Sequence, residues 1–370
     1  MKKIALTLII VLMAIALVLG GCSIESDTPA DNTVKEMTVT DSLGRTVTVP
    51  ANAEKFVAIG PGCLRLYCYV GDVSEIVGVE QIEVTNGVTG RPYAMANPEL
   101  LELPVIGPGG PNNAPDAEKI LEVAPDVIFS LYNSDASAVE ELHSKTNIPV
   151  VALSYGNTEV FDPALNESLE LIGKITGNEV RAAEVVQFFN ECKEDLDSRT
   201  GDIAFEDKPT VYLGAQSSRG THGIESTRGD FSLFMAVNVR NIVEEAGIHE
   251  YIMLDKEKLL ELDPNIIFID GGGLANVQED YTSSPQFYQG LTAFKTGQVY
   301  MQLPYNYYYT NIDIAISNAY YIGSIVYPEK FNDMDIVAKS NEIFKKLLGK
   351  ELYDQVAAEY YGGFQQLSFK

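Results

Sequence analysis

The sequence of 370 residues contains no tryptophan, only three histidines and only four cysteines. So few histidines argue against a site for bare zinc or manganese, because such sites draw on several histidine and carboxylate ligands. The cysteines include no Cys-x-x-Cys pair, so neither a structural zinc site nor a disulfide framework is expected. We therefore predict no metal held directly by the protein. Packing roles are expected for Cys63 and Cys68, with a functional thiol as the alternative, and the sequence assigns no role to Cys192.

Basic residues are also scarce, with 26 Lys and Arg against 52 Asp and Glu and a formal net charge of −26. A nucleic-acid partner is excluded on this ground, because its phosphates need basic contacts. The same deficit argues against a basic face that docks on anionic lipid. The simplest explanation of the acidity is that a large net charge keeps the protein soluble.

Enzyme motifs are missing as well, since the sequence has no nucleophile elbow, no HExxH and no ordered Ser/His/Asp signature. The segment Gly60-Pro61-Gly62 is not a nucleotide-binding loop, because position 65 is arginine where GxGxxG requires glycine. We therefore predict no catalytic residue and no cofactor. The alternative to this prediction is that the protein is an extracellular enzyme.

A processing signal occupies the N-terminus. A basic start at Lys2 and Lys3 precedes an almost unbroken apolar run, which is followed by Leu-Gly-Gly-Cys ending at Cys22. The run suits a signal-peptide core and is marginal for a membrane-spanning helix. The tetrapeptide resembles a bacterial lipobox, in which the chain is cut before a cysteine that is then lipidated. We predict a signal peptide over 1–21 and a lipidated, flexible tether over 22–36, with an uncleaved anchor helix as the alternative.

Eight short, continuously apolar runs alternate with amphipathic helical patterns, which is typical of parallel strands covered on both faces. The runs are residues 55–60, 76–80, 104–107, 126–131, 149–154, 210–215, 265–270 and 298–303. Between the two groups of strands, residues 162–200 show helical spacing that is interrupted by Gly173 and Gly177. A helix of that length could run from one lobe to another.

These patterns predict an α/β fold of two Rossmann-like lobes with central parallel sheets. One long connecting helix joins the lobes, and a ligand cleft lies between them. The expected parts are an N-terminal lobe over 37–158, a connecting helix over 159–202, a C-terminal lobe over 203–335, and a C-terminal helix and tail over 336–370.

One phrase is written twice in the chain. "EKILEVAPDVIF" at 118–129 and "EKLLELDPNIIF" at 257–268 are identical at seven of twelve positions. Each copy predicts a helix that begins after an aspartate N-cap, a proline that ends the helix, and a buried strand. Two copies imply two lobes of similar fold. The alternative is that the helix–proline–strand pattern, which is common in α/β proteins, arose twice independently.

The lipobox, the two lobes, the connecting helix and the paired phrase together resemble an ABC-transporter substrate-binding lipoprotein. The similarity is to the family of class III periplasmic binding proteins, which carries iron–siderophore, haem and cobalamin ligands, and it spans roughly 37–362. The segments 39–62 and 167–177 look like the family's usual opening and connecting helix. The resemblance implies a monomeric, extracytoplasmic, membrane-anchored protein that delivers a small-molecule metal chelate to an ABC permease with its ATPase.

In that family an acidic residue on each lobe docks onto arginines of the permease, seven positions before the proline of the helix–proline–strand unit. Here those positions hold Glu118 and Glu257. A glutamate in the first turn of a helix also interacts favourably with the helix dipole, so the two roles can coexist.

Ligand groups are expected in the loops that follow the strands. Arginine forks match anions, and tyrosines offer flat walls with a hydroxyl, which suits a polar, anionic chelate. The candidates are Arg65, Arg91, Tyr93, Arg219, His222, Arg228, Tyr305, Tyr307 and Tyr308. Each arginine has a solvated surface role as its alternative, and the tyrosines could instead be core or partner surface.

A ferric siderophore is the first choice of ligand, because a metal already wrapped in a chelator needs few ligands from the protein. A corrinoid, haem or another metal complex is the alternative, as is a sensor or adhesion lipoprotein that uses the same fold without transport. Since tryptophan is absent, the tyrosines must supply the aromatic wall.

Overall fold

The computed structural model describes residues 35–369 apart from 86, 112, 133–135 and 158–159. The predicted signal peptide, the lipidation site Cys22 and nearly all of the predicted tether therefore lie outside the described residues. Within the described part of the chain, no helix is both long enough and apolar enough to cross a membrane.

The N-terminal lobe is built on a parallel sheet in the order β4-β3-β5-β6, preceded by an antiparallel hairpin, β1-β2. The strands are β1 (Glu36–Thr40), β2 (Thr46–Pro50), β3 (Phe56–Ile59), β4 (Ile76–Gly78), β5 (Val127–Ser130) and β6 (Val150–Ala152). The helices are α2 (Cys63–Val70), η1 (Val73–Glu75), α3 (Gln81–Thr85), α4 (Pro92–Ala96), η2 (Pro98–Glu102), α5 (Ala117–Val123) and α6 (Ala136–Thr146). Of the five strands predicted here, 104–107 forms only a single bridge, between Val79 and Val105.

The C-terminal lobe repeats this plan in a sheet of order β13-β12-β11-β7-β9, in which only β13 is antiparallel. The strands of this sheet are β7 (Thr210–Gly214), β9 (Arg240–Asn241), β11 (Ile266–Asp270), β12 (Val299–Gln302) and β13 (Gln365–Gln366). Two further strands, β8 (Ser226–Arg228) and β10 (Tyr251–Met253), pair with each other in a separate antiparallel sheet. The helices are η3 (Phe205–Asp207), α9 (Ser232–Ala236), α10 (Ile242–Glu245), α11 (Lys256–Leu262), η4 (Gly271–Gly273), α12 (Leu274–Ser283), α13 (Pro285–Gly290) and α14 (Thr292–Thr296).

The repeated phrase occupies the same place in both sheets. It forms α5 and β5 in the first lobe and α11 and β11 in the second, and each of these strands pairs in parallel with the first strand of its sheet. Both helices even end alike, because Ala124 and Asp263 adopt left-handed conformations with φ of 45° and 39°. The two copies are therefore one supersecondary unit used twice, and the predicted two-lobed α/β fold is confirmed.

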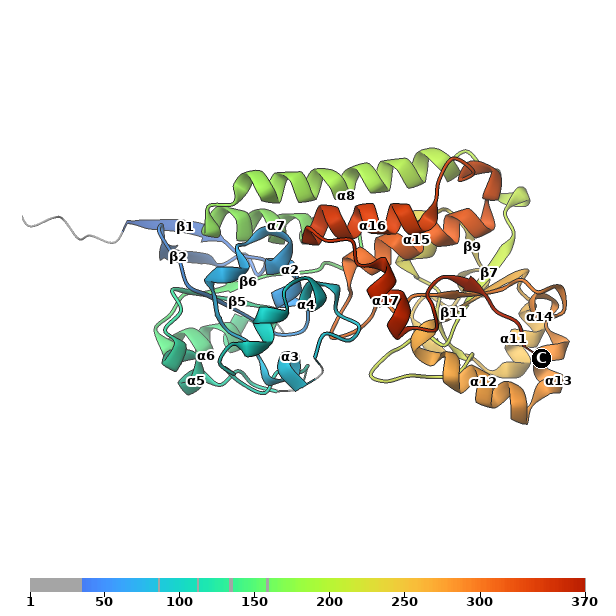
Figure 1. Cartoon of the computed structure of the whole chain (residues 1–370), viewed down its shortest axis with the longest axis horizontal. Helices are drawn as coiled ribbons and strands as arrows, with labels where there is room; N and C mark the ends of the chain where they lie inside the picture. Colours follow the sequence, from blue (N-terminus) through green and yellow to red (C-terminus); the bar gives the residue numbers. More distant parts are fainter. Residues whose placement is uncertain (1–34, 86, 112, 133–135, 158–159, 370) are drawn as a thin grey trace, which may run out of the picture. The chain divides into compact units, whose positions relative to one another are not determined.

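The connecting segment departs from the prediction of one helix over 159–202. It forms two helices, α7 (Pro163–Thr176) and α8 (Glu179–Thr200), with Gly177 in the left-handed region between them. The backbone N–H of Asn178 donates to the carbonyl of Gly173 at 2.7 Å and closes the end of α7. Helix α8 alone, about 33 Å long at ~1.5 Å per residue, runs along both lobes (Figure 1).

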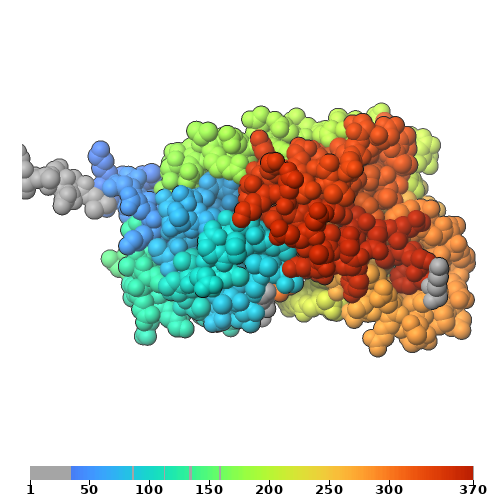
Figure 2. Space-filling model, in the orientation of Figure 1, coloured from blue at the N-terminus to red at the C-terminus, as the bar shows by residue number. Residues whose placement is uncertain are grey.

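Helix α15 (Ile312–Val326) and η5 (Pro328–Lys330) complete the residues predicted as the C-terminal lobe. The predicted C-terminal helix and tail over 336–370 form two helices, α16 (Ile336–Leu348) and α17 (Tyr353–Glu359), and the chain then returns as β13 to the edge of the second sheet. Helix α16 lies beside α8, and the C-terminal helices cover the junction of the lobes on the face shown in Figure 2. Two glycines end α7 and α16 in the same way, at Gly177 and Gly349.

One hydrophobic core extends through both lobes. It includes Phe56 and Phe129 of the first sheet, Phe189 of α8, Phe268 of the second sheet and Phe344 of α16. Separate clusters cover the outer face of each sheet. Because the central cluster is continuous, the lobes are packed against the same helices, which limits how freely they can move apart.

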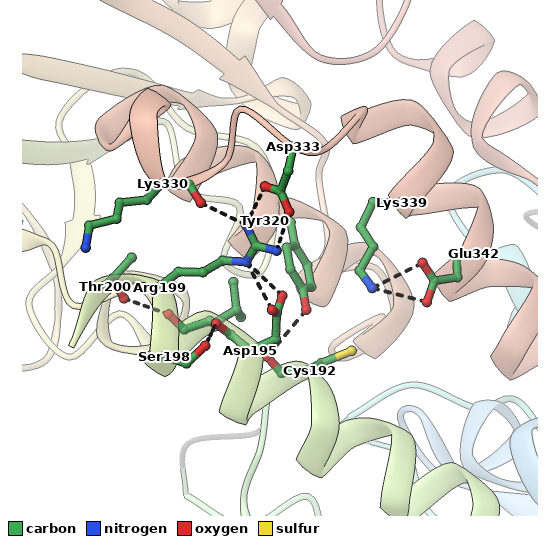
Figure 3. Close-up of polar contacts among 11 residues, drawn as sticks. Cys192, Asp195, Ser198, Arg199, Thr200, Tyr320, Lys330, Asp333, Lys339 and Glu342 are labelled. Carbon is green, nitrogen blue, oxygen red and sulfur yellow. Dashed lines mark hydrogen bonds and ion pairs between the residues drawn. The ribbon is translucent and has the colours of Figure 1, made fainter. Parts of the chain in front are cut away.

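An arginine fixes the C-terminal end of α8. The Arg199 guanidinium donates to Asp195 on its own helix, to both carboxylate oxygens of Asp333 at 2.7 and 3.0 Å, and to the carbonyl of Lys330 at 2.8 Å (Figure 3). At the other end of α8, Arg181 donates to the carbonyl of Tyr69 at 2.9 Å and to that of Lys346 at 2.7 Å.

Replacing Arg199 with alanine is expected to lower the free energy of unfolding by about 1–2 kcal/mol, because a bidentate ion pair and a backbone contact are lost together. Chemical denaturation monitored by far-UV circular dichroism measures the change. The matched control is Lys345→Ala, which removes a solvent-exposed pair with Glu351. Equal midpoints for both variants would contradict the role given to Arg199.

Candidate functional site

A cleft of about 990 Å³ lies between the two lobes. Its first wall comes from loops that follow strands of the N-terminal lobe, and its second from loops of the C-terminal lobe. The lining residues are Pro61, Ile82, Thr89, Pro111, Leu131, Leu153, Ser154, Tyr155, Gly156, Ser217, Ser218, Arg219, Gly220, Thr221, Gly272, Pro304, Asn306, Tyr307, Tyr308, Tyr309 and Tyr360. The volume is at the upper end of the ~300–1,000 Å³ usual for small-molecule sites.

The chemistry of this lining differs from that of the rest of the chain. Although the sequence holds 52 acidic residues, the described lining residues include no carboxylate, and Arg219 is the one cation among them. Tyrosines at five positions and several hydroxyl groups supply the remaining polarity. Such a surface suits a neutral or anionic molecule with flat groups and several hydrogen-bonding atoms.

Three tyrosines reach the cleft from the segment between β12 and α15. Tyr307 and Tyr308 were predicted from the sequence, and Tyr309 lies beside them. The Tyr308 hydroxyl donates to Glu80 at 2.8 Å. The ring of Tyr309 meets that of Tyr155 edge-on, with centroids 4.7 Å apart, so tyrosines from both lobes form one aromatic wall.

Arg65 lies behind this wall and not on its surface. Its side chain is fully buried in α2, where it donates to the Asn311 side chain at 2.9 Å, to the carbonyl of Tyr307 at 2.8 Å and to that of Thr310 at 3.0 Å. The guanidinium therefore supports the loop that carries the tyrosines and does not face a ligand. The sequence could not distinguish these roles, since the loop is about 245 positions away along the chain.

Arg91 and Tyr93 are also buried away from the cleft. Arg91 forms an ion pair with Glu83 and donates to its carbonyl at 2.9 Å, and the Tyr93 hydroxyl donates to the same carboxylate at 2.7 Å. Burial raises the pKa of the Tyr93 hydroxyl well above its ordinary value. These residues are structural, because the charge of Arg91 is already balanced inside the lobe.

The four remaining candidates, all from the C-terminal lobe, divide in a similar way. Arg219 lines the cleft from an exposed loop, whereas Nε2 of His222 lies 2.8 Å from the carbonyl of Ser218 beside it. Arg228 donates to Asp230 at 2.8 Å and does not line the cleft. Tyr305 is buried, and its ring packs against that of Phe231.

The family model for "Periplasmic binding protein" matches residues 65–303, which is more than half of the chain. The chain belongs to the periplasmic binding protein family. Its members are the solute-binding components of ABC transporters, so the family predicted from the sequence is confirmed.

Curated relatives of this periplasmic binding protein align over nearly their whole length. The molybdate-binding protein MolA of Haemophilus influenzae is 24% identical over 332 residues, covering 83% of this chain and 90% of the relative. The iron-uptake system-binding protein of Bacillus subtilis is 24% identical over 317 residues, covering 81% and 91%. Both relatives are binding proteins and not enzymes.

Solved structures show the same fold. Molybdate-bound MolA of Haemophilus influenzae superposes with a TM-score of 0.66 at 22% identity, covering 85% of this chain and 98% of that one. The TroA-like periplasmic binding protein FepB of Veillonella parvula also gives 0.66, at 24% identity, covering 85% and 97%. At this identity the likeness establishes the fold and leaves the ligand open.

Sequence reasoning missed three residues that line the cleft of this binding protein or bond to its lining. Tyr155 directly follows the predicted strand 149–154, and Glu80 is the last residue of the predicted strand 76–80. The rule that ligands lie beyond strand ends could therefore have found both. Tyr360 had no such signal, because it follows α17 near the C-terminus and reaches the cleft only through the packing of the whole chain.

Two buried carboxylates stand at strand ends beside the cleft. Burial raises the pKa of Glu80, although hydrogen bonds from Tyr132, Tyr308 and Gly60 act against this rise. Burial also raises the pKa of Asp270 to about 7, against the effect of hydrogen bonds from Gly272 and Ser217. Neither carboxylate has a cation bonded to it among the described residues, so burial dominates.

The raised pKa of Asp270 predicts a pH-dependent stability. The folded state binds this proton more tightly than the unfolded state, so the stabilisation grows as the pH falls below about 7 and is absent above it. Comparison of the wild type with Asp270→Asn by urea unfolding is expected to give a stability difference that changes by about 1 kcal/mol between pH 6 and pH 8. A difference that is constant across this range would show that Asp270 titrates elsewhere.

Proposed function

We propose that the chain is an extracytoplasmic solute-binding lipoprotein that captures a metal chelate in the interlobe cleft and delivers it to an ABC permease. A ferric siderophore is the chelate that we favour, and the protein performs no chemistry on it. The observation that carries the proposal is the lining of the cleft, where tyrosines and a single arginine stand in a large space without carboxylates among the described residues.

The lining favours a wrapped metal over a bare ion. The described residues contain no group of three or more His, Cys, Asp and Glu side chains arranged to hold a metal ion, and none of these four types is among the described lining residues. A chelator satisfies the metal itself and presents flat, polar and often anionic groups outward. Tyrosine faces and hydroxyls, with one guanidinium, match such a surface.

Molybdate, which MolA binds, is the competing ligand. A tetrahedral oxyanion is small and needs several donors converging on one point. Here the cleft measures about 990 Å³ and offers one cationic side chain among its described residues. Size and charge therefore support an organic complex, and a corrinoid or haem is the next candidate because both are large and flat.

Titration of the purified mature protein against a ligand panel tests this proposal. Tyrosine fluorescence is the readout, because the chain has 20 tyrosines and no tryptophan. The panel contains ferric catecholate, ferric hydroxamate, ferric citrate, cobinamide, haemin and sodium molybdate. A saturable signal with a ferric chelate is the expected result; a response to molybdate or cobinamide alone would reject the iron assignment.

We also propose that Glu118 and Glu257 dock onto the permease. Both are exposed in the first turns of equivalent helices, α5 and α11, and neither has a basic partner within 4 Å among the described residues. Three positions further along, on the same face, stand two identical leucines that remain exposed: Leu121 at 46% and Leu260 at 37%.

The exposed leucines support docking because the fold does not explain them. An apolar side chain that is left in water at the same position of both lobes suits a partner with two equivalent pockets. Lipid anchoring through Cys22 and transport as a monomer belong to the same proposal. A sensor lipoprotein of this fold would bind the ligand without needing the exposed glutamate and leucine that each lobe presents.

A further inference from the structure

Two consecutive residues of the tyrosine loop have a strained backbone. Tyr308 and Tyr309 have φ of 48° and 72°, in the left-handed region that bulky side chains rarely adopt. A non-glycine residue held in this region stores backbone strain. Such a loop keeps this form only if contacts from the surrounding structure offset the strain.

Arg65 supplies the largest set of these contacts. From α2 of the N-terminal lobe it donates to the carbonyls of Tyr307 at 2.8 Å, Tyr308 at 3.4 Å and Thr310 at 3.0 Å. Its Nε donates to the Asn311 side chain at 2.9 Å. One planar guanidinium thus bonds to four of the five residues from 307 to 311, a pattern that the single ammonium group of a lysine cannot reproduce.

Glu80 fixes the tip of the loop from another element. Its carboxylate accepts hydrogen bonds from the hydroxyls of Tyr308 at 2.8 Å and Tyr132 at 2.7 Å, and from the backbone N–H of Gly60 at 2.9 Å. The Tyr308 hydroxyl in turn accepts from the N–H of Gly110 at 3.0 Å. The phenol is therefore held to the N-terminal lobe as donor and as acceptor at once.

The same arginine also orients the opposite side of the aromatic wall. Its Nη1 donates to the Tyr155 hydroxyl at 3.2 Å, and that hydroxyl donates to the carbonyl of Gly62 at 3.0 Å. The Tyr155 ring is the one that meets Tyr309 edge-on. A single buried guanidinium therefore bonds to the hydroxyl of one tyrosine of this pair and to the backbone on both sides of the other.

We propose that Arg65 and Glu80 are positioning residues that hold the strained loop of residues 307–310 in place before a ligand binds, so that the tyrosine wall of the cleft is preformed. This inference rests on the proposed function of the cleft. A preformed wall does not have to be ordered by the ligand, which favours affinity, and it selects ligands by shape. A loosened loop accepts more shapes and binds each more weakly.

Amide hydrogen exchange of the ligand-free protein tests this inference, measured residue by residue by NMR. The reporters are two amides of the loop: Tyr307 N–H, which donates to the Tyr309 carbonyl at 3.1 Å, and Asn311 N–H, which donates to the Tyr305 carbonyl at 2.7 Å. Arg65→Lys keeps the positive charge but removes the planar guanidinium that bonds to several loop residues at once. It is expected to speed exchange at both amides at least tenfold while the amide of Ile128 in β5 keeps its wild-type rate. Unchanged exchange at the two loop amides would overturn the proposal.

Tyr308→Phe serves if Arg65→Lys does not fold, since it removes only the hydroxyl that Glu80 and Gly110 hold. It is expected to speed exchange at the same two amides, and wild-type rates there would again overturn the proposal. Tyr309→Gly provides a rescue, because glycine adopts positive φ without strain. In the Arg65→Lys background it is expected to restore part of the lost protection, whereas a purely additive effect would contradict the role of strain.

Because no ligand is added, these outcomes are independent of the panel titration. A chain that binds nothing in the panel but loses loop protection in Arg65→Lys would refute the proposed function and keep the positioning role. A chain that binds a chelate but keeps its loop protection in Arg65→Lys would keep the proposed function and refute the positioning role.

Discussion

Replacing Glu118 and Glu257 together with alanine is expected to abolish uptake of the chelate while its affinity for the protein stays unchanged. The two carboxylates are exposed on α5 and α11 and do not line the cleft. Their loss removes the charge that a basic partner would recognise and leaves the ligand contacts intact. Uptake by cells that express the variant, together with titration of the purified variant, measures the two effects separately.

The matched control is Glu140→Ala with Glu279→Ala, which removes one exposed carboxylate from each lobe outside the repeated phrase. This control is expected to transport at the wild-type rate. Leu121→Ser with Leu260→Ser is expected to weaken docking, whereas Val180→Ser, at an exposed site on α8, should not. A double glutamate variant that loses ligand affinity but still docks would contradict the assignment.

Replacing Arg219 with glutamine is expected to weaken binding of an anionic ferric chelate about 10- to 100-fold. Arg219 is the one cation among the described lining residues, and a hydrogen bond to a charged group contributes about 1.5–3 kcal/mol. The effect should shrink at high ionic strength, since Arg219 stands on an exposed loop. Titration at low and high salt measures both the loss and its screening.

Arg240→Gln is the control for this variant, because it removes an arginine that pairs with Glu245 and does not line the cleft. Its affinity is expected to equal that of the wild type. If Arg219→Gln also binds as the wild type does, the ligand makes no charged contact there and a neutral chelate becomes the better candidate.

The sequence predicted the sheets well because their signal is local. Runs such as 126–131 and 265–270 are continuously apolar, and a strand covered on both faces requires this pattern wherever it lies. The paired phrase predicted the equivalent corners of the lobes for the same reason, since the cap, the proline and the strand lie within about a dozen residues. The run 104–107 forms one bridge and no longer strand.

The sequence contained the signal for the break in the connecting segment, but we predicted one continuous helix there. Gly173 and Gly177 interrupt the helical spacing, and Gly177 is the left-handed cap that ends α7 and turns the chain into α8. A glycine within a helical pattern can be tolerated or can end the helix, and only the packing of α7 against its neighbours decides between these outcomes.

The roles of the arginines could not be predicted from the sequence, because they depend on distant partners. Arg65 and Arg91 occupy loops and helix starts near strand ends, where ligand contacts are common, yet both are buried. Arg65 meets a loop that lies far along the chain, and Arg91 meets Glu83 across a short turn. Arg219 has the same sequence context and stays exposed in the cleft.

Native mass spectrometry of the mature protein tests most directly whether the cleft takes a whole chelate. The protein is mixed in turn with a ferric catecholate, with the iron-free catecholate and with a ferric salt alone. One added mass equal to the intact ferric complex, less abundant with Arg219→Gln and absent with the ferric salt, is the predicted result. Binding of iron from the salt alone, at the same stoichiometry, would contradict it.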